Sequence, residues 1–287
     1  MPTKTKAFYK TLLFWEIVAG GVLLICAVII LAVNLKKPTP AEPAGESSAY
    51  TEPTQETTPA APIANPLQPN DFAFKGDYLD CLTAPAVLGI DVSEWQENVN
   101  WPQVKAAGVE FVMLRAGWRG SEQGLLFEDT LVQSHYAGAK AAGLQVGAYF
   151  FSQAVSVEEA VEEANFLLDI IKDWELDMPV VYDWEHIKDS YRTGTVDARL
   201  LTDCTKAFCD TVAKAGYTTM LYFNETQSFD LLYLNELTDY KFWLARYDDQ
   251  LDYPYRVDMW QYTETGSVPG IQGNVDINLY FPWLTDQ

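Results

Sequence analysis

The chain has 287 residues, of which 48% are hydrophobic and 14% aromatic, so it is long and apolar enough to bury a folded core. Its 19 basic and 40 acidic side chains give a formal net charge of −21, which disfavours nucleic acid as a partner because an acidic surface repels phosphate. With two histidines and no Cys-x-x-Cys pair among its four cysteines, the chain has no zinc pattern, and we expect neither a metal nor another cofactor.

Residues 17–33 form an unbroken apolar run, which further apolar residues extend upstream. The segment 12–35 has the length of a helix that crosses a bilayer. A cleaved signal peptide is the alternative, but its apolar core is normally shorter and ends at small residues, whereas this run ends at Asn34, Leu35 and two lysines. We therefore expect a short cytoplasmic tail over 1–11, a transmembrane anchor over 12–35, and a single-pass cell-membrane protein whose remaining chain is extracellular.

Residues 36–70 are rich in Pro, Ala, Thr, Glu and Ser and show no apolar periodicity. Such a composition cannot bury enough surface to fold, so we expect a disordered linker that holds the next domain away from the membrane. Residues 71–287 then form the folded domain. Within it, Cys81 could form a disulfide with Cys204 or Cys209 of a predicted helix, but the cysteine spacing indicates no disulfide framework.

From residue 87 onward, apolar strand-like runs alternate with helical stretches. Three of the helices lead into the next strand through a glycine, at Gly108, Gly143 and Gly216, as expected of a left-handed helix end. Repeated strand–helix–strand units predict a parallel sheet, and the last gaps are too short for helical crossovers. We therefore expect an α/β fold, an irregular (β/α) barrel of eight strands with helices lost towards the C-terminus. The predicted strands are 88–92, 111–116, 146–151, 180–184, 219–223, 242–246, 258–262 and 275–280, and the predicted helices are 102–107, 130–142, 157–171 and 197–215.

Polar and aromatic side chains follow the predicted strands, at the end where (β/α) barrels place their chemistry. Asp183 and Glu185 are two residues apart and point to the same side, roughly 6–7 Å apart along the chain. Their mutual repulsion should raise one pKa and keep one proton near neutrality. Each of these residues alone could be structural, as a cap, an ion pair or a core aromatic, and the hypothesis depends on their arrival together. The candidate catalytic residues are Asp91, Asp183, Glu185 and Asp276, and the candidate substrate-binding residues are Trp95, Tyr149, Tyr222, Arg246, Trp260 and Tyr262.

The segments 89–96 (GIDVSEWQ), 147–152 (GAYFFS), 183–185 (DWE), 242–247 (FWLARY), 260–262 (WQY) and 273–278 (GNVDIN) closely resemble glycoside hydrolase family 25, the Chalaropsis-type lysozymes. The resemblance covers about residues 87–283. It implies an irregular barrel and hydrolysis of the β-1,4 bond from N-acetylmuramic acid to N-acetylglucosamine. By position, Glu185 would be the general acid/base, Asp183 would orient the 2-acetamido group or stabilise the cationic centre, and Asp91 and Asp276 would complete the acidic floor. One departure is Phe150, where relatives often have His.

The expected function is therefore that of a retaining peptidoglycan hydrolase, whose partners are glycan strands and, through its N-terminal helix, the membrane. Its nucleophile could be the substrate's acetamido oxygen, assisted by Asp183, or a carboxylate such as Asp91. The main alternative is a non-catalytic glycan-binding module on the same barrel. A wall amidase or peptidase would need a Cys–His, Ser–His or zinc set, which two histidines support poorly.

Overall fold

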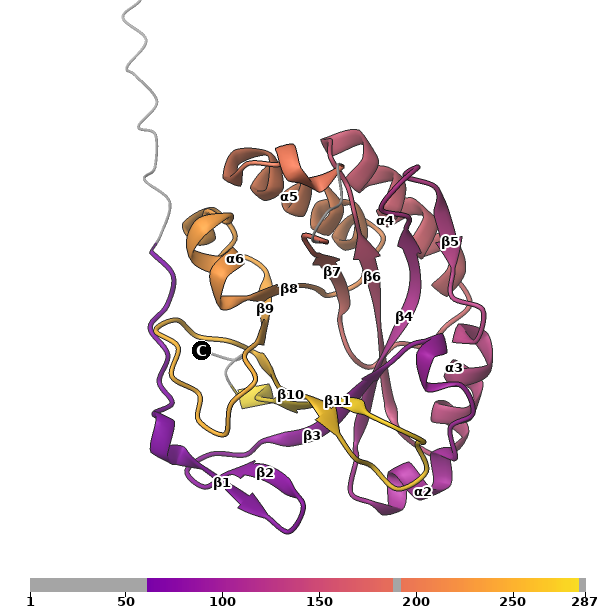
Figure 1. The fold of residues 1–287 in the computed structure, drawn as a ribbon, viewed down its shortest axis with the longest axis vertical. Helices are drawn as coiled ribbons and strands as arrows, with labels where there is room; N and C mark the ends of the chain where they lie inside the picture. Colours follow the sequence, from indigo (N-terminus) through magenta and orange to yellow (C-terminus); the bar gives the residue numbers. More distant parts are fainter. Residues whose placement is uncertain (1–60, 188–191, 284–287) are drawn as a thin grey trace, which may run out of the picture. The chain divides into compact units, whose positions relative to one another are not determined.

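The structure, a computed structural model, describes residues 61–187 and 192–283, and within them eight strands close into a barrel (Figure 1). All eight predicted strands and the predicted barrel are confirmed. The barrel strands are β3 (Val87–Val92), β4 (Phe111–Arg119), β6 (Gln145–Ser152), β7 (Val180–Trp184), β8 (Thr219–Asn224), β9 (Lys241–Ala245), β10 (Met259–Gly266) and β11 (Val275–Tyr280).

The predicted tail over 1–11 and the predicted anchor over 12–35 lie outside the described residues. In the part of the chain that is described, no helix has the length and apolarity needed to cross a bilayer.

The barrel is parallel except at one strand. The strands β3, β4, β6, β7, β8, β9 and β10 follow one another around the barrel, and each pairs in parallel with the next. The last strand, β11, is antiparallel to both of its neighbours, β10 and β3, and closes the barrel between them. A short strand, β5 (Leu126–Glu128), extends β4 as an antiparallel hairpin. Because six of the eight barrel pairings are parallel, most strands end at the same side of the barrel.

Helices cover the barrel between its early strands and give way to loops after β9, as predicted (Figure 1). The glycines Gly108, Gly143 and Gly216, with φ of 97°, 77° and 94°, follow α2, α3 and α5 and confirm the three predicted helix ends. The helices are α2 (Trp101–Ala106), α3 (Val132–Ala141), α4 (Val157–Ile171), α5 (Ala198–Lys214) and α6 (Glu225–Asp230), with 3₁₀ turns at Pro69–Asp71, Glu94–Gln96, Thr193–Thr195 and Leu234–Glu236.

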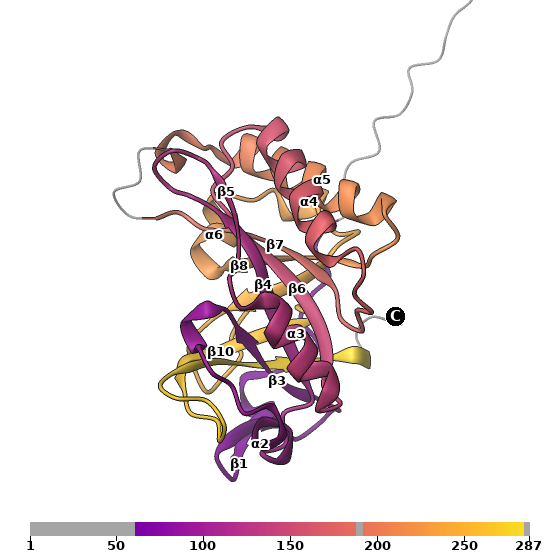
Figure 2. The same cartoon turned by 90° about the vertical axis from the view of Figure 1, so that its right-hand side faces the viewer.

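A hairpin that the sequence analysis did not predict covers the barrel where helices are missing. It consists of β1 (Phe72–Lys75) and β2 (Tyr78–Cys81) and lies on the side away from α4 and α5 (Figures 1 and 2). The Phe72 ring meets Trp260 at a centroid distance of 5.0 Å and Phe281 at 6.1 Å. The hairpin therefore buries the outer face of the closing strands.

Residues 61–70, which the sequence analysis places in the linker, contact the barrel. Ala64 forms a β-bridge with Tyr255, the Asn65 side-chain amide donates to the Tyr253 carbonyl at 3.0 Å, and Leu67 is buried. The packed part of the chain thus begins before the predicted boundary at residue 71. The rest of the predicted linker lies outside the described residues.

Two apolar layers hold the barrel. An inner layer fills the barrel itself and includes Met113, Val181, Met220, Trp243 and Met259, while a larger outer layer lies between the strands, the helices and the hairpin. The cysteines Cys81, Cys204 and Cys209 are buried and free, so the disulfide considered for Cys81 is not formed.

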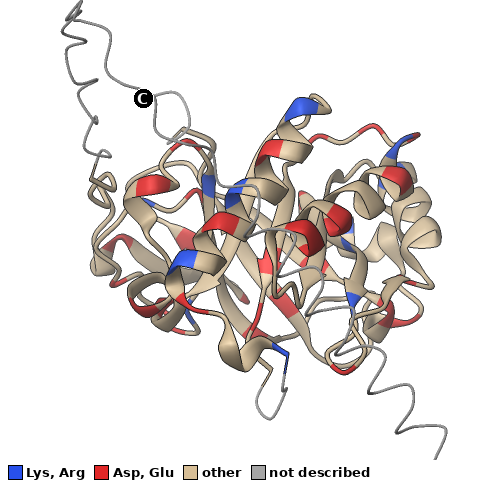
Figure 3. Cartoon of the chain, turned by 90° about the horizontal axis from the view of Figure 1, so that it is seen from above, with Lys and Arg blue, Asp and Glu red and all other residues tan. Residues whose placement is uncertain are grey.

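Acidic positions are spread over the helices and loops seen from above (Figure 3).

Candidate active site

Four carboxyl groups gather at one end of the barrel. Asp91 on β3 and Asp276 on β11 lie directly opposite each other in antiparallel register. Asp183 lies near the end of β7 and Glu185 follows that strand, so both side chains point to the same face. Asp91 and Asp183 are only 7% and 5% exposed. The charges of the other three carboxylates raise the pKa of Asp183, which indicates that the four groups form one electrostatic cluster.

Two amides hold one oxygen of Asp91. Gln261 Nε2 and Asn278 Nδ2 donate to Asp91 Oδ2 at 2.9 and 2.8 Å. The amide oxygens are held in turn, because the hydroxyl of Tyr222 donates to Gln261 at 2.9 Å and the Trp243 indole donates to Asn278 at 2.8 Å. Burial raises the pKa of Asp91, while these hydrogen bonds favour its ionised form. Asp91 is therefore the carboxylate best stabilised as an anion.

The other carboxyl groups tend to keep their protons. Burial, followed by the charge of Asp91, raises the pKa of Asp276 to about 9. Burial and the neighbouring Glu185 raise the pKa of Asp183 well above its ordinary value. Burial, then the charges of Asp91 and Glu264, also raise the pKa of Glu185. This separation of protonated and ionised groups is what acid-assisted chemistry at neutral pH requires.

Glu185 opens into a cavity of about 620 Å³ between the ends of β7, β8 and β9. The backbone beside it is clamped, because Gln227 Nε2 donates to the Trp184 carbonyl at 2.8 Å and Gln153 Nε2 donates to the Glu185 carbonyl. Both glutamines are buried, so the main chain at the carboxylate is fixed while the side chain reaches the cavity.

Arg115 brings a positive charge to the cluster. Its guanidinium is paired with Asp129 at 2.9 Å and Glu94 at 3.2 Å, and only 11% of the side chain is exposed. Its charge partly offsets the effects that raise the pKa of Asp183. Asp183 Oδ1 itself is buried and receives no hydrogen bond within the described residues.

Three of the six predicted substrate-binding residues, Tyr149, Tyr222 and Arg246, lie at this cluster or line its cavity. Trp95 follows β3 and is 77% exposed, as a ring that stacks on a sugar should be. Tyr149 and Tyr222 extend from the inner layer of the barrel towards the carboxylates. Arg246 lines the cavity of Glu185 but is already paired with Glu225 and, at 3.5 Å, with Asp248.

Trp260 and Tyr262 lie elsewhere, which corrects their assignment to this surface. Both side chains point outward from β10, where Trp260 is fully buried against Phe72 and its indole donates to the Arg246 carbonyl at 2.7 Å. Trp260 therefore cannot contact a substrate in this structure. Tyr262 is 5% exposed and lines a second pocket beside the hairpin. Between them, Gln261 points inward to Asp91.

Some residues of the site were missed. Gln261 and Asn278 occupy the inward positions of their strands, and Asn278 shares the face of Asp276, a strand parity that could have identified it. Arg115 stands out as a charged residue within an apolar run. Phe150, the departure from the family pattern, is buried against Phe166 of α4, so it affects helix packing and does not line the cavity.

Within the described residues, no group of three or more His, Cys, Asp or Glu is arranged to hold a metal ion. The site presents a cluster of carboxyl groups, in which burial and neighbouring charges raise the pKa values of Asp183, Glu185 and Asp276 while two amides donate hydrogen bonds to Asp91. Hydrolysis of a glycosidic bond needs this combination, so the fold and the site together define a glycosidase.

Comparison with known proteins specifies the class further. Residues 90–271 match the family model of glycosyl hydrolases family 25, and the chain belongs to this family. Lysozyme M1 of Streptomyces globisporus is 28% identical over 209 residues, covering 68% of this chain and 67% of that protein. The autolytic lysozyme of Clostridium acetobutylicum is 28% identical, covering 66% of this chain and 54% of that protein.

Solved structures show the same fold. The modular autolysin LytC from Streptococcus pneumoniae has a TM-score of 0.60 and 26% identity, covering 68% of this chain and 47% of that one. A bacterial lysozyme from Streptomyces coelicolor has a TM-score of 0.55 and 26% identity, covering 68% of this chain and 91% of that one. The chain thus spans about half the length of the modular autolysin and nearly all of the smaller lysozyme.

Proposed function

We propose that this protein is a muramidase, which hydrolyses the β-1,4 bond between N-acetylmuramic acid and N-acetylglucosamine in peptidoglycan. The observation that carries the proposal is the carboxyl cluster at the end of the barrel, where Glu185, with a raised pKa, faces an open cavity and two amides donate hydrogen bonds to Asp91. Family membership and relatives named as lysozymes support the substrate. A LytC structure described as a complex with a synthetic peptidoglycan ligand supports it further.

In this mechanism Glu185 is the general acid. Burial, with the charges of Asp91 and Glu264, raises its pKa and so favours its protonated form, which donates its proton to the leaving glycosidic oxygen as the bond breaks. The clamped backbone at Trp184 and Glu185 limits the positions from which the proton is delivered. After departure of the first product, the resulting carboxylate accepts a proton from the attacking water, as a retaining reaction requires.

Two nucleophiles are compatible with this site. In the first, the substrate's acetamido oxygen attacks, and the free Oδ1 of Asp183 accepts a hydrogen bond from the acetamido N–H. In the second, Asp91 attacks directly, which its stabilised ionised form favours. Substrates in which the acetamido group is replaced by a non-nucleophilic group separate the two, because only the first mechanism loses its nucleophile.

Digestion of purified peptidoglycan with mass analysis of the products tests the function. New reducing ends on muramic acid are the expected result. Intact glycan with bound protein would indicate a binding module instead, and released stem peptides would indicate an amidase or peptidase. Either of these outcomes would overturn the proposed activity.

We also propose that residues 12–35 anchor the enzyme in the cell membrane, with the barrel outside the cell. The apolar run supports this location, and so does a substrate that lies outside the cell. The linker would then let the barrel reach glycan strands at a distance from the membrane.

A further inference from the structure

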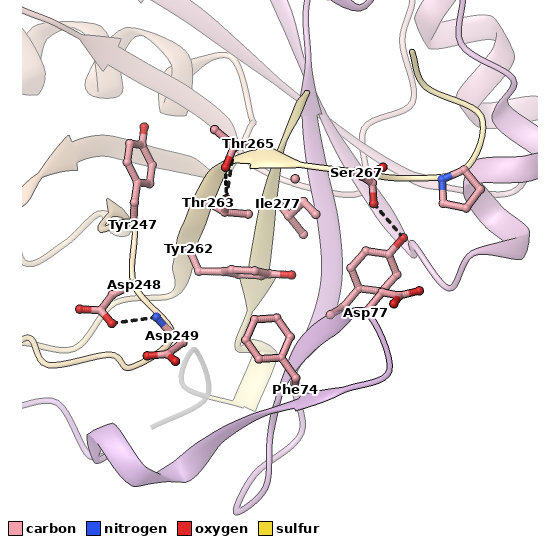
Figure 4. Close-up of a pocket in the computed structure, with 13 residues that line it drawn as sticks. Phe74, Asp77, Tyr247, Asp248, Asp249, Tyr262, Thr263, Thr265, Ser267 and Ile277 are labelled. Atoms are coloured by element: carbon pink, nitrogen blue, oxygen red, sulfur yellow. Dashed lines mark hydrogen bonds between the residues drawn. The ribbon is translucent and has the colours of Figure 1, made fainter. Parts of the chain in front are cut away.

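A second pocket, of about 770 Å³, lies beside the cavity of Glu185 (Figure 4). The β1–β2 hairpin, the loop after β9 and the strands β10 and β11 line it. Tyr247 lines both this pocket and the cavity of Glu185, so the two hollows are neighbours. We call the pocket the hairpin subsite and define it by Phe74, Asp77, Tyr247, Asp248, Tyr262 and Thr265.

The aromatic side chains of the hairpin subsite are arranged to receive a ligand. Phe74 is 59% exposed on a short hairpin, and Tyr247 is 51% exposed, while the largely buried Tyr262 supplies the floor. Figure 4 shows the Phe74 and Tyr262 rings at the same hollow. Exposed rings around a concave surface are unfavourable in water unless they bind something, and flat rings suit the apolar faces of sugars.

The polar side chains indicate a neutral ligand rich in hydroxyl groups. Asp77, Asp248 and Asp249 supply acceptors and Thr263 and Thr265 supply hydroxyls on the opposite side. Sugar hydroxyls and acetamido groups can both donate to and accept from such groups. Three aspartates repel carboxylates, so the pocket suits the hydroxyl and acetamido groups of the sugars and not the lactyl carboxylates of muramic acid or the acidic groups of stem peptides.

The hairpin subsite is connected to the catalytic carboxyl groups. The Tyr247 hydroxyl donates to Gln261 Oε1 at 3.2 Å, and the same Gln261 donates to Asp91. Glu264, between the two threonines of β10, lies close enough to raise the pKa values of Glu185 and Asp276. A glycan strand in the Glu185 cavity would therefore continue past Tyr247 into the subsite.

The hairpin that forms one wall precedes residue 90, where the match to the family begins. We propose that the hairpin subsite binds additional sugar residues of the glycan strand that is cut at Glu185, and that it lies partly outside the segment that matches the family. This inference rests on the proposed function and specifies where the rest of the substrate lies. Its binding energy would favour long strands over short fragments.

The test is the dependence of KM on the length of peptide-free glycan fragments. For wild type, KM should fall as the fragments become long enough to reach Phe74. Phe74→Ala should lose up to about ten-fold of this gain, since an aromatic contact contributes roughly 0.5–1.5 kcal/mol beyond the area it buries. Phe74→Trp, which keeps a ring, should retain the gain. Leu82→Ala is the control, because Leu82 is 65% exposed just after the hairpin and does not line the pocket. Its KM should depend on fragment length as that of wild type does.

Titration calorimetry with the same fragments and the Glu185→Gln variant measures the length dependence without turnover. Suppose that wild type cuts glycan and that the KM of Phe74→Ala falls with fragment length as steeply as that of wild type. This result would overturn the subsite and leave the proposed function intact. A gain confined to fragments with stem peptides would also overturn it. If no fragment is cut, the proposed function fails. Calorimetry still decides whether the subsite binds glycan, by comparing the Glu185→Gln variant with the double variant that also carries Phe74→Ala.

Discussion

At the scale of single residues, the site separates carboxyl groups that differ little in chemistry. Asp91 receives two amide hydrogen bonds on one oxygen, whereas Asp183 Oδ1 receives none in the described structure. Asp276 lies opposite Asp91, and burial together with the charge of Asp91 raises the pKa of Asp276 and favours its protonated form. Local hydrogen bonding thus decides which groups are acids and which are anions.

The central test at this scale is Glu185→Gln. The amide preserves the shape of the side chain but cannot donate the proton, so we expect turnover of peptidoglycan to fall by about 10²–10⁴-fold. Binding of glycan and the far-UV spectrum should remain as in wild type. Wild-type turnover by this variant would exclude Glu185 as the acid.

Glu264 offers a test that leaves the carboxyl cluster itself intact. Its charge helps to raise the pKa of Glu185, so Glu264→Gln should lower that pKa. Glu185 would then lose its proton at a lower pH, and the upper limb of kcat/KM against pH should move towards acid, because one charge that opposes ionisation of Glu185 is gone. Glu175→Gln, the same charge change near the opposite end of β7, is the control. A limb that stays in place, or one that moves equally in both variants, contradicts the assignment.

Asp276 links the site to stability. Its pKa is about 9 in the folded protein against 3.8 ordinarily, so the unfolded chain releases this proton near pH 4 and the folded chain retains it to about pH 9. Between these values a rising pH favours the unfolded state. Asp276→Asn should therefore raise the melting temperature at pH 8, by about 2–4 °C for each kcal/mol gained, and the difference should shrink towards pH 4. A difference that is constant with pH would argue against this ionisation.

The limits of sequence reasoning at this scale are clear at β10. The run Trp260, Gln261, Tyr262 was correctly placed in a strand, but both aromatic residues were assigned to the surface around the carboxyl groups, to which only Gln261 points. Which of two alternating sets faces the barrel interior depends on the tertiary fold, and a short apolar strand with both faces buried does not reveal it. For Asp183 and Glu185 the parity was clear, because carboxylates are rarely placed among packed helices.

At the scale of elements, segments with a continuous apolar run or a helix-end glycine were predictable, even when short, and segments without such a signal were not. Eight strands, four helices and their glycine ends follow from apolar runs and helix-end residues. The hairpin β1–β2, the strand β5 and the helix α6 have at most six residues each and depend on contacts from distant parts of the chain. Phe72, for example, is buried only because Trp260 and Phe281 lie beneath it.

At this scale we predict that residues 61–70 stabilise the folded domain against unfolding. Because Leu67 is buried and Asn65 bonds the Tyr253 carbonyl, a fragment of residues 71–287 should be less stable than one of residues 61–287. Burying one leucine contributes roughly 1.5–3 kcal/mol, which corresponds to a difference of about 5 °C in melting temperature. Thermal unfolding of both fragments checks this, and equal melting temperatures would show that the segment adds nothing.

At the scale of the whole molecule, the proposed anchor should decide where the enzyme is found. Full-length protein should sediment with membranes, whereas the fragment 61–287, which lacks the apolar run, should remain in the supernatant. Resistance of the pellet to high salt distinguishes insertion from adsorption of a charged domain. Recovery from cells of only a shortened, soluble form would favour a cleaved signal peptide instead.

The closure of the barrel has a consequence for when the enzyme can act. Its first strand, β3, pairs with its last, β11, and this pairing brings Asp91 and Asp276 together. During synthesis the N-terminal part of a chain is available to fold first. Here, however, Asp276 and the Asn278 amide that donates to Asp91 both lie on β11, which is the last barrel strand to be synthesised. A chain that lacks β11, whether nascent or truncated, therefore has no complete cutting site, so a lytic activity appears only after β11 has been made and has paired with β3.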